Sequence, residues 1–243
     1  MMQVSVVVTV LNEADNILGL LLGLLNQTQE PNEVVIVDAG STDGTLQLIK
    51  VFREKYPNFP LRVFSKKGNR SFGRNFGIKK AQSRWLALTD AGCLPHKNWL
   101  AKLIKSAQET KAEVVAGYYD ACPRNKFEAA VVPYMLVMPD RLDSNHFLPA
   151  TRSMLFKKEV WQKMGGFSED LTLSEDYALA HKIARSEFKI SFTQEAKVAW
   201  LPIQTWTHFF QTVSQMAEFD VRAGLTRIKA YLVFFRYFLG LFL

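Results

Sequence analysis

Acidic side chains follow apolar segments at several places in this sequence, and carboxylates in such places can bind ligands or accept protons. Asp38 ends the apolar run EVVIVD, and Asp90 follows the apolar run WLALT. Glu175 and Asp176 are adjacent and open a segment with helical spacing. A carboxylate can accept hydrogen bonds from a base or ribose, ligate a hard cation or take a proton from an attacking hydroxyl. These four acids are the first candidates for chemistry.

The segment DAGSTDGT at residues 38–45 leads from a predicted strand into a predicted helix. Its glycines let the backbone turn, so that Asp38 and Ser41 are presented at the start of the helix. Helix capping by Ser41, Thr42 or Asp43 is the competing interpretation. The sequence has neither GxxxxGK[ST] nor GxGxxG, the phosphate-binding patterns. We therefore predict that Asp38 contacts a nucleoside rather than a phosphate.

Two further segments carry groups suited to a diphosphate. Arg70 and Arg74 lie four residues apart in GNRSFGRNFG, so on a helix they share one side, and guanidinium groups match phosphate oxygens. Asp90 in TDAGC suits a divalent cation that bridges a diphosphate, because hard cations take oxygen ligands. One carboxylate alone makes a poor site for Mg²⁺ or Mn²⁺, and a turn-forming Asp is the competing interpretation.

Glu175 and Asp176 point in different directions if the segment is a helix, so one can contact the protein while the other faces a substrate. The competing interpretation is that two negative charges simply stabilise the start of the helix. The four histidines lack HxH or HExxH spacing, which argues against a zinc enzyme.

The elements that must position these residues alternate as strand and helix through the first half. Because parallel strands end along one edge, where ligands bind, we expect Glu13, Asp38, Ser41 and Asp90 to gather there. The chain length of 243 residues suits one α/β domain. After about residue 120 the pattern loosens, and we assign this half to the second substrate. Strands are predicted at 4–10, 33–38, 61–64, 85–89, 113–117, 189–192 and 197–200, and helices at 17–25, 45–56, 71–81, 99–109 and 176–186.

The charge and composition of the sequence limit which classes of partner are plausible. Lys and Arg number 30 against 23 Asp and Glu, which makes an anionic partner plausible. Residues 50–84 hold eleven basic residues, interpreted mainly as solvated helix faces, and no nucleic-acid-binding module is recognised. Residues 221–243 are aromatic-rich and basic with no acid, typical of a helix in an anionic membrane interface. A helix that closes the core or contacts another copy is the alternative. Two cysteines without a CxxC pattern favour a reducing cytoplasm.

Taken in order, these motifs resemble the family 2 glycosyltransferases of the membrane-associated bacterial type. That resemblance implies a GT-A fold, with a mostly parallel central sheet flanked by helices and a C-terminal amphipathic helical tail. It implies a glycosyltransferase domain over residues 1–225, with a nucleotide-binding half at 1–117, an acceptor half at 118–225 and a membrane-interfacial helix at 226–243. The matching segments are VTVLNE at 8–13, DAGSTDGT at 38–45, GRNFG at 73–77, DAGC at 90–93, KMGGF at 163–167 and ED at 175–176.

The resemblance also implies residue roles. Thr9, Leu11 and Glu13 would border the nucleotide-sugar donor, with Asp38 and Ser41 near the base. Arg74 would meet the base or the phosphates, with Arg70 beside it, and Asp90 would hold ribose and metal. Asp176 would be the general base of an inverting transfer, with Glu175 beside it. A helix with Trp206, Gln211, Gln215 and Arg222 would lie near donor and acceptor.

One position departs from the family pattern, because Gly92 stands where the Asp-x-Asp motif has its second carboxylate. Either Asp90 and the diphosphate hold a Mg²⁺ or Mn²⁺ ion with water, or cationic residues such as Arg70 replace the metal. The expected acceptor is a glycan or lipid-linked sugar in cell-envelope polysaccharide synthesis, at the cytoplasmic face of the membrane. Two alternatives stay open: a catalytically lapsed protein that binds a nucleotide sugar or scaffolds an assembly, and a nucleotidyltransferase on a related scaffold.

Overall fold

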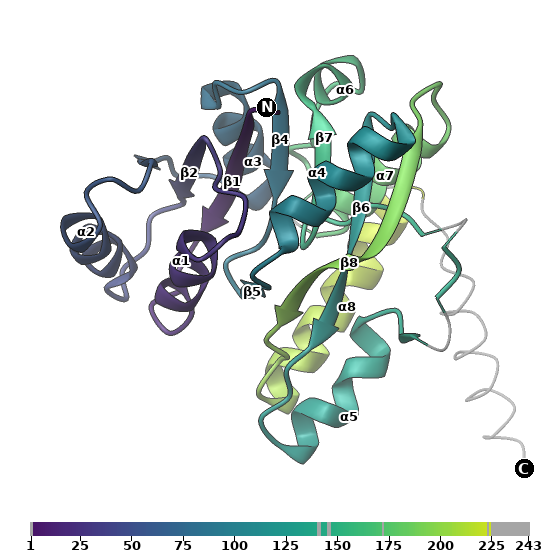
Figure 1. The fold of residues 1–243 in the computed structure, drawn as a ribbon. Helices are drawn as coiled ribbons and strands as arrows, with labels where there is room; N and C mark the ends of the chain where they lie inside the picture. Colours follow the sequence, from purple (N-terminus) through teal and green to yellow (C-terminus); the bar gives the residue numbers. More distant parts are fainter. Residues whose placement is uncertain (1, 140–141, 145–146, 172, 223, 225–243) are drawn as a thin grey trace, which may run out of the picture.

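One eight-stranded sheet forms the centre of the molecule, with helices packed against it (Figure 1). The computed structural model describes residues 2–139, 142–144, 147–171, 173–222 and 224. The strand order is β3-β2-β1-β4-β7-β6-β8-β5. The predicted membrane-interfacial helix at 226–243 lies outside the described residues.

The first four strands in the order are parallel. β1 (Val4–Val10) pairs with β2 (Glu33–Asp38) and β4 (Trp85–Leu88), and β2 pairs with β3 (Leu61–Ser65). These strands are apolar on both faces, since Val4, Val6 and Val8 join one buried cluster while Val7 joins the other. A strand covered on both sides has no need of polar alternation.

The other four strands mix directions. β7 (Met154–Lys157) runs antiparallel to β4 and to β6 (Val114–Ala121), while β8 (Ile190–Trp200) runs parallel to β6. The short β5 (Cys93–Pro95) pairs antiparallel with β8 at the edge. The predicted α/β class with a mostly parallel sheet is confirmed, because among the strands of the described residues only β5 and β7 run against the rest.

Helices connect the strands and cover the sheet. α3 contacts β1 and β2, whereas α4 contacts β6 and β8, and α1 packs on α2 (Figure 1). The helices are α1 (Ile17–Leu25), α2 (Thr45–Lys55), α3 (Arg70–Lys80), α4 (Trp99–Thr110), α5 (Lys126–Met135), α6 (Lys158–Lys163), α7 (Glu175–Ala184) and α8 (Trp206–Arg222).

Four elements were missing from the sequence prediction, β5, β7, α5 and α6, and two predicted strands are one. β5 has three residues, too few to show a period, and α5 contains Pro133, a residue that usually breaks helices. Here Pro133 lies near the end of α5, while Asn125 caps its start by accepting a hydrogen bond from the Glu128 N–H at 2.9 Å. The predicted strands at 189–192 and 197–200 are the two ends of β8, whose pairing with β6 shifts register beside Gly117.

The proposed division at residue 117 falls inside β6, and a single sheet runs through both halves. No helix in the described part of the chain is long and apolar enough to cross a membrane.

Candidate active site

The loops that follow β1 and β2 are joined by hydrogen bonds at the carboxyl edge of the sheet. The Asn12 N–H donates to Ser41 Oγ at 2.9 Å, and the Thr42 N–H donates back to Asn12 Oδ1 at 2.9 Å. The Glu13 N–H donates to Thr45 Oγ1 at 2.8 Å. Asn12 has a left-handed φ of 55°, which Asn tolerates better than most residues. The two loops are therefore fixed as one unit.

Asp38 ends β2 inside this unit. Its carboxylate is 1% exposed and accepts hydrogen bonds from the N–H groups of Gly40 at 3.0 Å and Ser41 at 3.1 Å. Thr9 is half-buried under α3, where a Cβ on Gly73 would approach its methyl group to 2.9 Å, and Leu11 is 54% exposed. Asp38 thus shapes the loop, and contact with a base stays a prediction.

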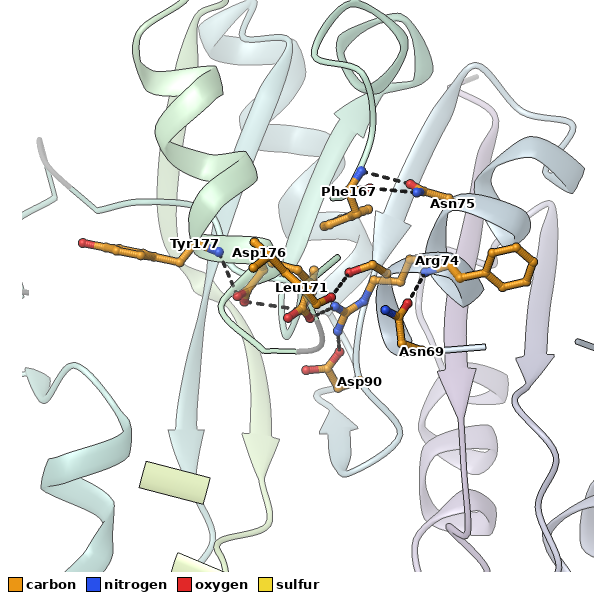
Figure 2. A network of polar contacts seen from close by, with 12 residues as sticks. Asn69, Arg74, Asn75, Asp90, Phe167, Leu171, Asp176 and Tyr177 are labelled. Atoms are coloured by element: carbon orange, nitrogen blue, oxygen red, sulfur yellow. Dashed lines mark hydrogen bonds and ion pairs between the residues drawn. The ribbon is translucent and has the colours of Figure 1, made fainter. Parts of the chain in front are cut away.

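Arg74 joins the two halves of the sheet edge. Its guanidinium is 3% exposed and forms an ion pair with Asp90 at 2.7 Å (Figure 2). It forms a second ion pair with Glu175. The guanidinium carbon also lies 5.6 Å from the centre of the Phe167 ring. Arg74 therefore connects Asp90 to Glu175, and its expected contact with the sugar donor stays a prediction.

The charged groups at this centre shift one another's pKa values. Burial works to raise the pKa of Asp90, but the guanidinium groups of Arg74, Arg70 and Arg152 outweigh burial and hold it below its ordinary value. For Glu175, burial together with nearby Asp176 raises the pKa despite Arg74. Burial works against the charge of Arg74, yet its acidic neighbours raise its pKa, so this arginine stays charged.

Helix α3 also positions the segment that leads to Glu175. The Asn75 amide donates to the Phe167 carbonyl at 2.9 Å, while Asn75 Oδ1 accepts from the Phe167 N–H at 3.0 Å (Figure 2). Ser71 Oγ donates to the Leu171 carbonyl at 2.6 Å. Gly166 has a φ of 76°, and a Cβ there would approach Asn75 Oδ1 to 2.9 Å. The GGF segment is therefore needed for this close approach.

Glu175 and Asp176 have different surroundings at the start of α7. Glu175 is 2% exposed and is paired with Arg74, whereas Asp176 is half-buried. The Asp176 carboxylate accepts from the Tyr177 N–H at 2.8 Å and from Thr151 Oγ1 at 3.5 Å. Of the two acids, Asp176 is the one accessible to a substrate.

The expected site residues differ in how close they lie to the ion-paired centre. Arg74, Asp90 and Glu175 are in contact, and Arg70 is exposed but close enough to lower the pKa of Asp90. The pKa of Glu13 is raised by burial, and Asp90 adds to this, which links the first loop to the centre. In α8, Arg222 pairs with Glu218 of the same helix at 2.5 Å.

Sequence reasoning missed Arg152, a half-buried residue just before β7. Its guanidinium carbon lies 5.3 Å from the Tyr119 ring centre and 5.2 Å from that of Trp200. Both rings come from distant strands, β6 and β8, so no local spacing could reveal the stack.

The described residues do not fit a divalent cation well. No group of three His, Cys, Asp or Glu side chains comes together in the described ranges. Asp90 contributes a carboxylate already paired with Arg74, and Gly92 contributes no side chain. Three guanidinium groups lie near enough to lower the pKa of Asp90, and their positive charges would repel a metal cation.

The sheet order and the acids at its carboxyl edge define an α/β protein of the class whose ligands bind at the strand ends. The family model described as Glycosyl transferase family 2 matches residues 5–165. This chain therefore belongs to glycosyltransferase family 2.

Known relatives are similar over most of this chain. The glycosyltransferase AglE of Haloferax volcanii is 26% identical over 196 residues, covering 79% of this chain and 64% of the relative. The O-antigen chain rhamnosyltransferase WbaN of Salmonella anatum is 23% identical, covering 76% of this chain and 63% of the relative. The chain thus spans slightly less than two thirds of these relatives.

Solved structures share the fold. The mannosyltransferase PcManGT of Pyrobaculum calidifontis, in complex with GDP-Man and Mn²⁺, has a TM-score of 0.70 at 23% identity and covers 91% of this chain and 62% of its own. S. aureus TarS 1–349 in complex with UDP-GlcNAc has a TM-score of 0.66 at 20% identity, with coverage of 93% and 68%. At such identities the likeness shows the fold alone, which agrees with the predicted GT-A class.

Proposed function

We propose that this protein is an inverting glycosyltransferase that moves a sugar from a nucleotide-diphosphate sugar to an acceptor hydroxyl. Membership of family 2 supports the reaction class. The observation that carries the mechanism is the asymmetry of the acidic pair, in which Glu175 is tied to Arg74 while Asp176 is accessible.

In the proposed reaction Asp176 takes the proton of the acceptor hydroxyl. The acceptor oxygen forms a bond to the anomeric carbon as the bond from that carbon to the diphosphate breaks, and the electron pair leaves with the diphosphate. A single displacement from the opposite side inverts the anomeric carbon. Glu175 and Arg74 act as positioning residues, because their ion pair fixes the start of α7 on which Asp176 lies.

For the donor, we assign the nucleotide to the unit of the first two loops. Leu11, Glu13 and Ser41 are at least partly exposed there, beside the buried Asp38 and half-buried Thr9. Two structures that share this fold are complexes with GDP-Man and with UDP-GlcNAc, so the fold accepts more than one base. We infer a glycan or lipid-linked acceptor, since relatives include a succinoglycan biosynthesis protein and an O-antigen chain rhamnosyltransferase.

A divalent cation is used within this fold, as the Mn²⁺ complex of PcManGT indicates. In this chain Asp90 would be the ligand, but its pairing with Arg74 and the glycine at 92 leave an incomplete set. Gly92 is also the observation that favours the second candidate, a lapsed protein that binds a nucleotide sugar without transferring it.

The test is Asp176→Asn, measured by hydrolysis of the donor that a thermal-shift screen of nucleotide sugars selects. Loss of a general base lowers rates by about 10²–10⁴-fold, while donor affinity should persist. The matched control is Asp170→Asn, an exposed acid six positions earlier, which should retain the wild-type rate. Wild-type hydrolysis by Asp176→Asn would refute the base, and a wild-type protein that binds donor without hydrolysis or transfer would favour the lapsed candidate.

We also propose that the protein works at the cytoplasmic face of a membrane. Exposed aromatic side chains gather on α5 and α8, where Tyr134 is 73% exposed and Trp206 and Phe210 are each 61% exposed. Such side chains are favourable at a bilayer interface. Co-sedimentation with phosphatidylglycerol vesicles should carry the wild type down and leave Trp206→Ser/Phe210→Ser largely in solution. Equal recovery of both proteins in the supernatant would contradict this placement.

A further inference from the structure

Arg152 is held in place by its two chain neighbours. On one side, Thr151 Oγ1 lies 3.5 Å from the Asp176 carboxylate. On the other, the fully buried Ser153 accepts from Trp99 Nε1 at 2.9 Å and donates to the Ala196 carbonyl at 3.0 Å. The backbone of Arg152 is thus fixed beside the acid that we assign as base.

The guanidinium of Arg152 is oriented by aromatic rings. It lies 5.3 Å from the Tyr119 ring centre and 5.2 Å from the Trp200 ring centre, so both aromatics hold the same group. None of the ion pairs found between described residues includes Arg152, although Asp90 and Asp176 are near enough to favour its charge. Stacking uses the faces of a guanidinium and leaves its N–H groups at the rim free to donate.

The same stack reaches the position of the missing carboxylate. Trp200 pairs with Cys93 across β5 and β8, and the Leu201 N–H donates to the Gly92 carbonyl at 3.1 Å. A Cβ built on Gly92 meets no heavy atom within 4 Å, so the space beside it is open. Arg152 therefore lies by the open space where a metal-binding carboxylate would stand.

We propose that Arg152 binds the diphosphate of the sugar donor and supplies the positive charge for which this chain has no complete metal site. The inference rests on the proposed function and names the residue that neutralises the leaving group. As the sugar–oxygen bond breaks, negative charge grows on the diphosphate, and a fixed guanidinium stabilises that charge by hydrogen bonds to its oxygens. The aromatic stack holds the guanidinium in place before the donor arrives.

The first test compares Arg152→Gln with the wild type by calorimetry in EDTA, using UDP, GDP, uridine and guanosine. The variant should bind the preferred diphosphate about tenfold to a hundredfold more weakly, because it loses a charged hydrogen bond, while its affinity for the nucleoside stays unchanged. Arg53→Gln, on the exposed side of α2, is the matched control and should bind like the wild type. Equal diphosphate affinity of Arg152→Gln and wild type would overturn the assignment.

Arg152→Lys covers the case in which the glutamine variant does not fold. It keeps the charge but loses the planar fork, so we expect a diphosphate affinity severalfold below that of the wild type and an unchanged nucleoside affinity. Wild-type affinity for both ligands would count against a role that depends on the guanidinium.

Gly92→Asp supplies an independent test, since its side chain has room. Wild-type binding of the diphosphate should be the same in EDTA and in Mn²⁺, whereas Gly92→Asp should bind more tightly in Mn²⁺ than in EDTA. Wild-type binding that disappears in EDTA and returns with Mn²⁺ would overturn the inference and leave the proposed transferase intact. If no nucleoside diphosphate binds the wild type in either condition, the proposed function itself fails.

Discussion

The two halves of the sheet edge are held by different forces. In the first half, the loops after β1 and β2 are joined by exposed or part-buried hydrogen bonds from backbone N–H groups to side chains, such as Asn12 N–H to Ser41 Oγ and Ala14 N–H to Asp43 Oδ2, with no ion pair between them among the described residues. In the second half, buried ion pairs connect Arg74 to Asp90 and to Glu175, and rings stack on Arg152. The bonded partners are 29 to 32 residues apart in the first half and up to 101 in the second.

The first half therefore mainly fixes a loop geometry, whereas the second half concentrates buried charge. Hydrogen bonds at an exposed edge contribute little to stability, because water replaces them, yet they fix a loop geometry. Buried charges are costly when a partner is lost, and they keep a strong field in one place. This contrast suits the proposed function, in which the geometry of the first half binds the nucleotide and the charges of the second half stabilise the departing diphosphate.

The largest effect should come from Arg74→Met, which leaves two carboxylates unpaired. Loss of one partner of a buried ion pair costs about 3–5 kcal/mol of unfolding free energy, and here Glu175 is 2% exposed. Urea unfolding followed by fluorescence measures the change.

The matched change is Arg84→Met, because Arg84 pairs with Glu159 at 3.6 Å with its side chain 70% exposed. An exposed pair contributes about 0–1 kcal/mol, so this variant should unfold near the wild-type midpoint. If both variants lost the same stability, the second half would not depend on its buried charges, and the contrast between the halves would fail.

Most of the fold could be predicted from local sequence. Apolar runs such as residues 33–38 end where their strands end, since burial on both faces requires an unbroken apolar run. α5 and β5 escaped prediction because a proline and a three-residue length conceal them, although tertiary packing stabilises both elements.

The residues of the candidate site could be proposed from the sequence, but the contacts between them could not. The sequence identifies Asp90, Glu175 and Asp176 as candidates, but Arg74, which joins Asp90 to Glu175, was expected to face the sugar donor. Arg152 gave no signal, because Tyr119 and Trp200 approach it only when β6 and β8 pair. Side chains that act through long-range contacts cannot be recognised from spacing.

A smaller effect, which should depend on pH, is expected for Asp90→Asn. Burial works to raise the pKa of Asp90, but Arg74, Arg70 and Arg152 hold it below its ordinary value, so its carboxylate stabilises the fold above the unfolded pKa of about 3.9. At pH 7 the variant should lose about 1–2 kcal/mol, the difference between a charged and a neutral hydrogen bond. That difference should be lost as the pH falls from about 4 through the lowered folded pKa, because the wild-type carboxylate then binds a proton too.

Ser41→Ala is the matched change in the first half, where the lost partner is the Asn12 N–H at 2.9 Å. Because this bond is exposed and neutral, the variant should lose only about 0.5 kcal/mol, and by the same amount at pH 7 and at pH 3.5. Urea midpoints of both variants and the wild type across this range decide the matter. A loss for Asp90→Asn that stays constant with pH would mean that the charge of Asp90 does not stabilise the second half, and the two halves would then be held by forces of the same kind.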